Sequence, residues 1–158
     1  MFKVIVAHQV RSVWQALDRR DRRPVLRGFA RNFVYENVAA DHAFGGTFRT
    51  VEQMDRHFDV LFGLLPDLTF EVCDVVVAGH PAATRVVVRV RLTASLPDGT
   101  PYVNDLVQYL HLRWGKVVAV RAMVDNVRAQ RACDQLEAAG RLVASAPAEL
   151  RQTENASL

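Results

Sequence analysis

The spacing of apolar residues changes from a helical to a strand period near residue 67. Before that point apolar residues recur every three or four positions, which predicts a helix over 6–18 and a longer one from Thr50 to Pro66. Asp21 fits the N-cap, and Pro24 fits the first turn, of a short helix that lies between these two longer helices. The apolar face of the longest helix comprises Val51, Met54, Phe58, Leu61, Phe62 and Leu65. A short strand over 33–35 interrupts this helical half.

After residue 67 apolar and polar residues alternate, as they do in strands. Strand-like segments cover 68–77 and 84–96, and a long hairpin over 102–125 turns at Trp114-Gly115-Lys116. A final helix over 126–139 follows Asp125. Helices followed by strands predict an α+β fold, here a cone-shaped α+β barrel. Three N-terminal helices would pack on a strongly curved, mostly antiparallel sheet, with a C-terminal helix and a hollow between the layers.

Length and composition bound the domain organisation. The chain has 158 residues, 50% hydrophobic and 23% charged, which is ordinary for one globular domain over 1–144. Residues 145–158 are small and polar and predict a flexible tail. No apolar run reaches the ~18 residues of a membrane span, so we expect no membrane partner. Cys73 and Cys133 lack metal-ligand neighbours, which predicts no metal site and a reducing, cytoplasmic location.

The formal net charge is +3, and the densest basic segment is 17–31. Asp18 and Asp21 interrupt this segment, and aromatic residues do not interleave it as stacking platforms for nucleic acid would. We therefore predict a solvated basic surface and no nucleic-acid partner.

The order FVYENV, LLPDLTFEVCDVVVAG, LPDGTPYVND and WGKVVAVRAMVD resembles the nuclear-transport-factor-2-like superfamily. Within it the chain is most similar to SnoaL-like polyketide cyclases and to the ketosteroid isomerase and limonene epoxide hydrolase groups. The resemblance covers about residues 8–139. It implies a small hydrophobic, oxygenated substrate of secondary metabolism, chemistry without a cofactor, and a homodimer through the outer face of the sheet. An apolar face of Val86, Val88, Val90 and Leu92 is consistent with that dimer.

Only some of the family's catalytic residues have counterparts in this chain. The base of the isomerases falls on Asn37, and the two groups that donate hydrogen bonds to the enolate in those enzymes fall near Trp14 and Gln108, which can still donate. The hydrolase arginine falls on Arg89, but the two carboxylates fall on Arg91 and Ala122. The water-binding tyrosine and asparagine of those hydrolases correspond to Tyr35 and Asn37. The cyclase acid falls on Ala122, or on Asp125 if the turn is shifted.

The register of the 102–125 hairpin decides which polar side chains enter the hollow. One register points Asn104, Leu106, Gln108 and Leu110 inward, where Asn104 and Gln108 would form a polar wall. A shift by one residue points His111 inward as a proton shuttle. We favour the first register. Arg89 and Arg91 share a face of 84–96 and form either an anion site in the pocket or a solvated outer surface.

Several other residues have both a functional and a structural interpretation. Asp125 is either the acid/base or simply the N-cap of the last helix. Asp41 and His42 lie on a glycine-containing loop near the expected mouth of the hollow, where they are either an acid–base pair or an ordinary loop pair. Met54 and Phe58 are predicted to contact substrate, and His57 beside them borders either the pocket or the core.

Three functions follow from these residues. The first is an enzyme of the SnoaL-like type that cyclises or isomerises a polyketide-like substrate by proton transfer. Its predicted catalytic residues are Asp125, His111 and Gln108. Its predicted substrate-binding residues are Trp14, Tyr35, Asn37, Met54, Phe58, Arg89, Arg91 and Asn104. The second is a non-catalytic binding or accessory protein, and the third is an epoxide hydrolase-like enzyme with an altered catalytic set.

Overall fold

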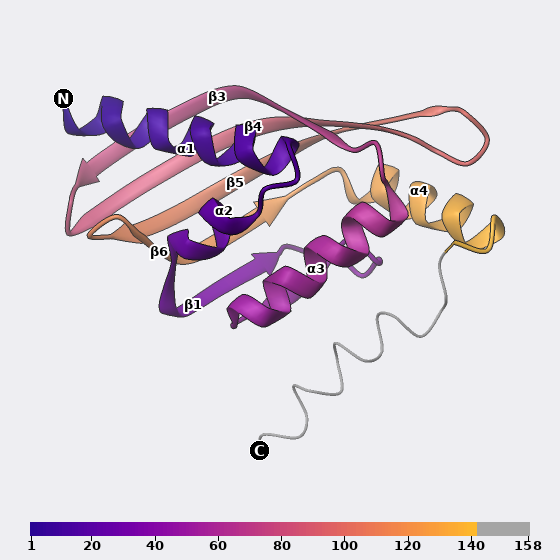
Figure 1. Ribbon diagram of the computed structural model, residues 1–158, viewed down its shortest axis with the longest axis horizontal. Coiled ribbons are helices and arrows are strands. Elements are labelled where there is room, and N and C mark those ends of the chain that lie inside the picture. The colour runs from indigo at the N-terminus through magenta and orange to yellow at the C-terminus, as the bar shows by residue number, and fades with distance from the viewer. Residues whose placement is uncertain (142–158) are drawn as a thin grey trace, which may run out of the picture.

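The computed structural model describes residues 1–141, which form four helices and six strands (Figure 1). The predicted tail over 145–158 lies outside the described residues. The helices are α1 (Phe2–Asp18), α2 (Arg23–Gly28), α3 (Val51–Leu64) and α4 (Asn126–Ala138). The strands are β1 (Phe29–Asn37), β2 (Thr47–Phe48), β3 (Thr69–His80), β4 (Ala83–Ser95), β5 (Pro101–Arg113) and β6 (Lys116–Met123).

The strands form one sheet in the order β2-β1-β6-β5-β4-β3. Only β1 and β6 pair in parallel, which confirms a mostly antiparallel sheet. The sheet is open, with β2 and β3 as its edges, so it does not close into a barrel. The prediction had no strand at β2, because two residues are too few to show a period. The helices α1, α2 and α3 cover one face, and α4 lies at one end (Figure 1).

The side chains of β4 face the opposite way from the prediction that placed Arg89 and Arg91 in the pocket. Val86, Val88 and Val90 are fully buried under the helices, whereas Arg89 and Arg91 point away from the core. Cross-strand partners share a face, and Val88 stands opposite Gln108 while Arg91 stands opposite Asp105. The prediction that the arginines line the pocket is therefore wrong. The valines cannot form the dimer surface, and the homodimer stays a prediction without that support.

The β5–β6 hairpin adopts the register favoured from the sequence. Trp114 and Gly115 both have positive φ, of 51° and 78°, as a two-residue turn between twisted strands requires. The turn pairs Leu112 with Val117, and a register shift between Leu112 and His111 then brings Gln108 opposite Ala122 on the covered face of the sheet. His111 stands opposite Ala119 on the outer face. The placement of Gln108 and Asn104 inward is therefore confirmed, and the alternative with His111 inward is wrong.

The helix ends follow their capping chemistry. A capping box begins α3, since the Thr50 hydroxyl accepts from Gln53 N and the Gln53 side chain accepts from Thr50 N. Asp125 is the N-cap of α4, as predicted. The short helix α2 differs by one residue from its prediction, because Arg22 is its N-cap and Asp21 accepts from Arg23 N at 3.2 Å. Within residues 1–141 no helix combines the length and apolar character needed to cross a membrane.

Candidate active site

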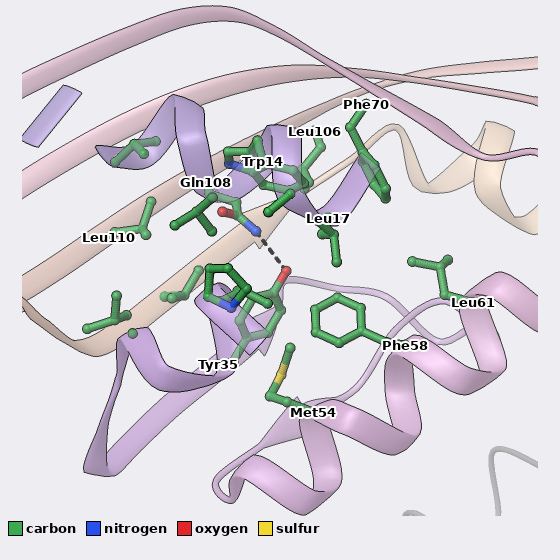
Figure 2. A pocket seen from close by; sticks show the side chains of 18 of the residues that line it. Trp14, Leu17, Tyr35, Met54, Phe58, Leu61, Phe70, Leu106, Gln108 and Leu110 are labelled. Atoms are coloured by element: carbon green, nitrogen blue, oxygen red, sulfur yellow. Dashed lines mark hydrogen bonds between the residues drawn. The ribbon is translucent and has the colours of Figure 1, made fainter. Parts of the chain in front are cut away.

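A cavity of about 650 Å³ lies between the covered face of the sheet and helices α1, α2 and α3 (Figure 2). Its wall is mainly apolar, because the inward positions of each strand and helix carry aliphatic and aromatic residues. Figure 2 shows Trp14, Leu17, Met54, Phe58, Leu61, Phe70, Leu106 and Leu110 around it. Pockets for small molecules commonly have volumes of ~300–1,000 Å³ and a few fixed polar groups. The size and lining therefore suit a hydrophobic small molecule.

One hydrogen-bonded pair provides the polar centre of this wall. Gln108 Nε2 donates to the Tyr35 hydroxyl at 2.9 Å, and both side chains line the cavity (Figure 2). Burial raises the pKa of the Tyr35 hydroxyl to about 12, although the bond from Gln108 acts in the opposite direction. Tyr35 is thus neutral at physiological pH. Because its oxygen already accepts from Gln108, its own hydrogen can be donated to a ligand.

His57 is a buried histidine in the cavity wall. It lies on the inner face of α3, and its ring packs on Phe48 with centroids 4.6 Å apart. Burial lowers the pKa of His57 to about 4, so the imidazole is neutral at pH 7. His57 was not among the predicted site residues. The signal was present, because residues 54, 57, 58 and 61 form one continuous helical face.

Besides Tyr35, four predicted binding residues line the cavity. Trp14 projects from α1, and Met54 and Phe58 project from α3 (Figure 2). Asn37 lies at the end of β1, where its Nδ2 donates to Gly46 O at 3.1 Å and ties the 38–46 loop to the strand. Each of these residues lies on the side of its helix or strand that faces the cavity. The roles of the residues in binding stay a prediction.

Asn104 faces inward but is occupied by structural contacts. Its Nδ2 donates to the Tyr102 hydroxyl and to Asp125 O, and its Oδ1 accepts from Asp125 N, all at 3.0 Å. It is not among the residues that line the cavity. Asn104 therefore fixes the chain between β6 and α4.

The other predicted polar residues lie away from the cavity. The Asp125 carboxylate accepts from Val127 N and Arg128 N and pairs with Arg128 at 3.2 Å. His111 is on the outer face of β5, and Arg89 and Arg91 reach toward Asp105 there. Strand alternation explains these positions, because β6 keeps Ala122 inward and Asp125 comes after the strand ends.

The loop pair proposed from the sequence is not brought together as an acid–base couple. Asp41 is exposed, whereas His42 is buried and its Nε2 lies 3.0 Å from Asn126 Oδ1. Asn126 Nδ2 in turn donates to Val38 O. His42 therefore attaches the 38–46 loop to the start of α4.

Asp21 is the carboxylate among the described lining residues. It lies beside α2 and pairs with Arg23 Nε at 2.8 Å. The hydrogen bond from Arg23 keeps the pKa of Asp21 below its usual value, so it stays ionised. Among residues 1–141 no group of three or more His, Cys, Asp or Glu side chains is arranged to hold a metal ion. The buried titratable side chains that line the cavity are Tyr35, His57 and Tyr102.

Helices over one face of an open, curved sheet, with an apolar pocket between them, define the nuclear-transport-factor-2-like fold class. The model of the SnoaL-like domain matches residues 10–120, so the chain belongs to the SnoaL-like domain family. This match confirms the resemblance found in the sequence.

Solved structures agree with this assignment of the fold. A proposed SnoaL-like polyketide cyclase from Jannaschia sp. CCS1 is 22% identical, with a TM-score of 0.67 over 83% of this chain and 92% of that one. AclR from Streptomyces galilaeus, a proposed hydroxylase, is 19% identical, with a TM-score of 0.65 over 89% and 99%. IdmH from Streptomyces antibioticus, a proposed polyketide cyclase, is 20% identical, with a TM-score of 0.63 over 80% and 96%. No curated protein matches the sequence.

Proposed function

We propose that the protein is a SnoaL-type enzyme that binds a neutral, polyketide-like ketone and moves a proton next to its carbonyl group, without a cofactor. The observation that carries this proposal is the Tyr35–Gln108 pair inside an apolar cavity. A buried hydroxyl with a free hydrogen selects a ligand oxygen, and the surrounding apolar wall selects a hydrophobic skeleton. The similarity to the Jannaschia protein and to IdmH, both proposed polyketide cyclases, supports the substrate class.

The chemistry requires a proton acceptor and a stabiliser for the developing oxyanion. The ligand carbon next to the carbonyl loses its proton to a nitrogen of the neutral His57. The electron pair of that C–H bond moves onto the carbonyl oxygen, where the Tyr35 hydroxyl donates a hydrogen bond to the enolate. Return of the proton to another carbon gives an isomer. Attack of the enolate on a second carbonyl of the same molecule gives a ring, and His57 then protonates the new alkoxide.

The low pKa of His57 makes it a weak base while the cavity is empty. A negative enolate in the same apolar space stabilises the imidazolium, because opposite charges attract strongly where the local dielectric constant is low. The ion pair would form only as the proton moves. The site is therefore matched to the reacting state more than to the bound ketone.

A specific observation favours the alternative of a non-catalytic binder. Ala122, at the position of the family's acid, is buried and has no ionisable group. If His57 never accepts a proton, the cavity would bind ligands without changing them. We do not propose the epoxide hydrolase-like alternative, because Arg89 lies on the outer face of the sheet, away from the cavity.

Deuterium exchange separates the enzyme from the binder without knowledge of the natural substrate. In D₂O the protein should accelerate exchange of the hydrogens next to the carbonyl of 2-tetralone, followed by proton NMR. His57→Phe should return the rate to the background, and Tyr35→Phe should lower it by roughly 10–100-fold through loss of oxyanion stabilisation. Asp125→Asn is the matched control and should keep the wild-type rate. Binding of 2-tetralone with no exchange above background would refute the enzyme and leave the binder.

A further inference from the structure

The acidic residues of the chain are unevenly distributed. The segments 1–17, 22–35, 75–97 and 106–124 contain no aspartate or glutamate, although the chain has 17 acidic residues. They hold most of α1, α2, β1, β4, β5 and β6, together with the second half of β3. Evenly mixed acidic residues would not leave such long segments without a carboxylate. Any surface that these segments form together therefore has no negatively charged side chain of its own.

Parts of all four segments meet at one end of the molecule. Val6 on the first turns of α1 packs with Val86 and Leu112, near the β3–β4 and β5–β6 turns. Trp114 N donates to Pro81 O at 2.7 Å, which joins the two turns. Figure 1 shows the N-terminus of α1 and both turns at the end of the long axis opposite α4. We call this the α1–hairpin end, composed of residues 1–10, 26–29, 79–85 and 111–117.

The α1–hairpin end is cationic and is not neutralised. Its cations are Lys3, Arg27, Arg113 and Lys116, together with the half-buried Arg85, whose Nη1 is covered and has no hydrogen-bond partner. None of the five belongs to a salt bridge in the described part of the chain, where all ion pairs involve other arginines. Lys116 Nζ donates to Arg27 O at 2.7 Å, which brings α2 into the same surface. A surface of this kind attracts an anionic partner over about one Debye length.

The same end exposes large apolar side chains. Met1, Trp114 and Val4 are 100%, 76% and 72% exposed, the highest values for large hydrophobic residues in the described chain. Ile5 beside them is 50% exposed. Trp114 occupies a tight turn that the bond to Pro81 holds in place, so its ring is presented outward without loss of backbone order. Tryptophan and aliphatic residues among lysines and arginines are typical of proteins that lie at a membrane interface.

We propose that the α1–hairpin end docks on an anionic lipid surface. Trp114, Val4 and Ile5 enter the headgroup region, and the unpaired cations bind the lipid phosphates. We expected no membrane partner because the sequence lacks an apolar span, but docking at the surface needs none. The cavity reaches this end, since Val6, Gly115 and Val117 line it. If the proposed function holds, a hydrophobic substrate can pass between bilayer and cavity here.

Co-sedimentation with large unilamellar vesicles tests the docking directly. The full chain should bind vesicles of 30% phosphatidylglycerol and 70% phosphatidylcholine at low salt. It should bind pure phosphatidylcholine roughly tenfold more weakly and lose binding in 0.5 M NaCl. Trp114→Asn should weaken binding roughly tenfold. Asn-Gly suits this turn, so the substitution keeps the hairpin. Arg113→Gln should weaken binding about fivefold.

Matched controls at the opposite end are Val127→Asn and Arg131→Gln, which should bind vesicles as the wild type does. Equal weakening in the controls, or no binding of anionic vesicles at low salt, would overturn the proposal. Binding that Arg113→Gln weakens while Trp114→Asn leaves it unchanged would also overturn it, in favour of an acidic macromolecule. Loss of docking leaves exchange of 2-tetralone in solution untouched, so the two proposals fail separately.

Discussion

Tyr35→Phe is expected to lower the free energy of unfolding by about 1–3 kcal/mol. The substitution removes the acceptor of the buried Gln108 amide, whose Nε2 lies 2.9 Å from the Tyr35 oxygen. A buried donor without a partner costs its full desolvation, which exceeds the net value of the lost hydrogen bond. Urea unfolding followed by circular dichroism measures the difference.

The double variant Tyr35→Phe with Gln108→Leu provides the test of this cause. Removing both partners leaves two apolar groups of similar shape, so most of the lost stability should return. The two substitutions should thus be strongly non-additive, as expected for residues in direct contact. Additive losses in the double variant would show that the pair does not act as a unit, and that water or another group satisfies the amide.

The second large effect is the pH dependence that His57 gives to stability. Burial lowers its pKa from 6.5 to about 4 in the folded state. Between these values the unfolded chain holds one proton more than the folded chain, so stability rises with pH across this window. The contribution is complete above about pH 6.5 and is lost as the pH falls toward 4. A shift of this size amounts to about 3 kcal/mol.

His57→Phe is expected to remove this part of the pH profile. The phenyl ring keeps the packing on Phe48 and does not titrate. Urea midpoints of the wild type should fall between pH 6.5 and 4 by more than those of the variant. His8→Gln, at an exposed position of α1, should retain the wild-type profile. Parallel profiles for the wild type and His57→Phe would contradict the burial of a neutral imidazole.

The elements of this fold were largely predictable because their local chemistry agrees with their packing. Thr50 and Gln53 form a capping box that needs no tertiary contact, and Trp114 and Gly115 form the tight turn of the hairpin by local backbone conformation. The register shift between Leu112 and His111 left no signal in the sequence. The strands were long enough to show their period. Only β2, with two residues, depends on its pairing with Tyr35 and Glu36 and left no trace in the sequence.

The candidate site was only partly predictable. Alternation along β4 places Val88 and Val90 on one face of the sheet and Arg89 and Arg91 on the other. The sequence pattern alone does not show which of the two faces the helices cover. Transfer from the hydrolases pointed the arginines inward, although their neighbours on β5 required the valines there. His57 looked like one histidine among apolar residues, and burial that lowers its pKa appears only in the assembled cavity.

The proposed function rests on the claim that Tyr35 donates its hydrogen to the carbonyl oxygen of a ligand inside the cavity. The most direct measurement is the infrared stretch of ¹³C=O-labelled 2-tetralone bound to the wild type and to Tyr35→Phe. A hydrogen bond weakens the carbonyl bond, so the stretch in the wild type should lie at lower frequency than in Tyr35→Phe. The same frequency in both proteins, with the ketone bound in each, would contradict the claim.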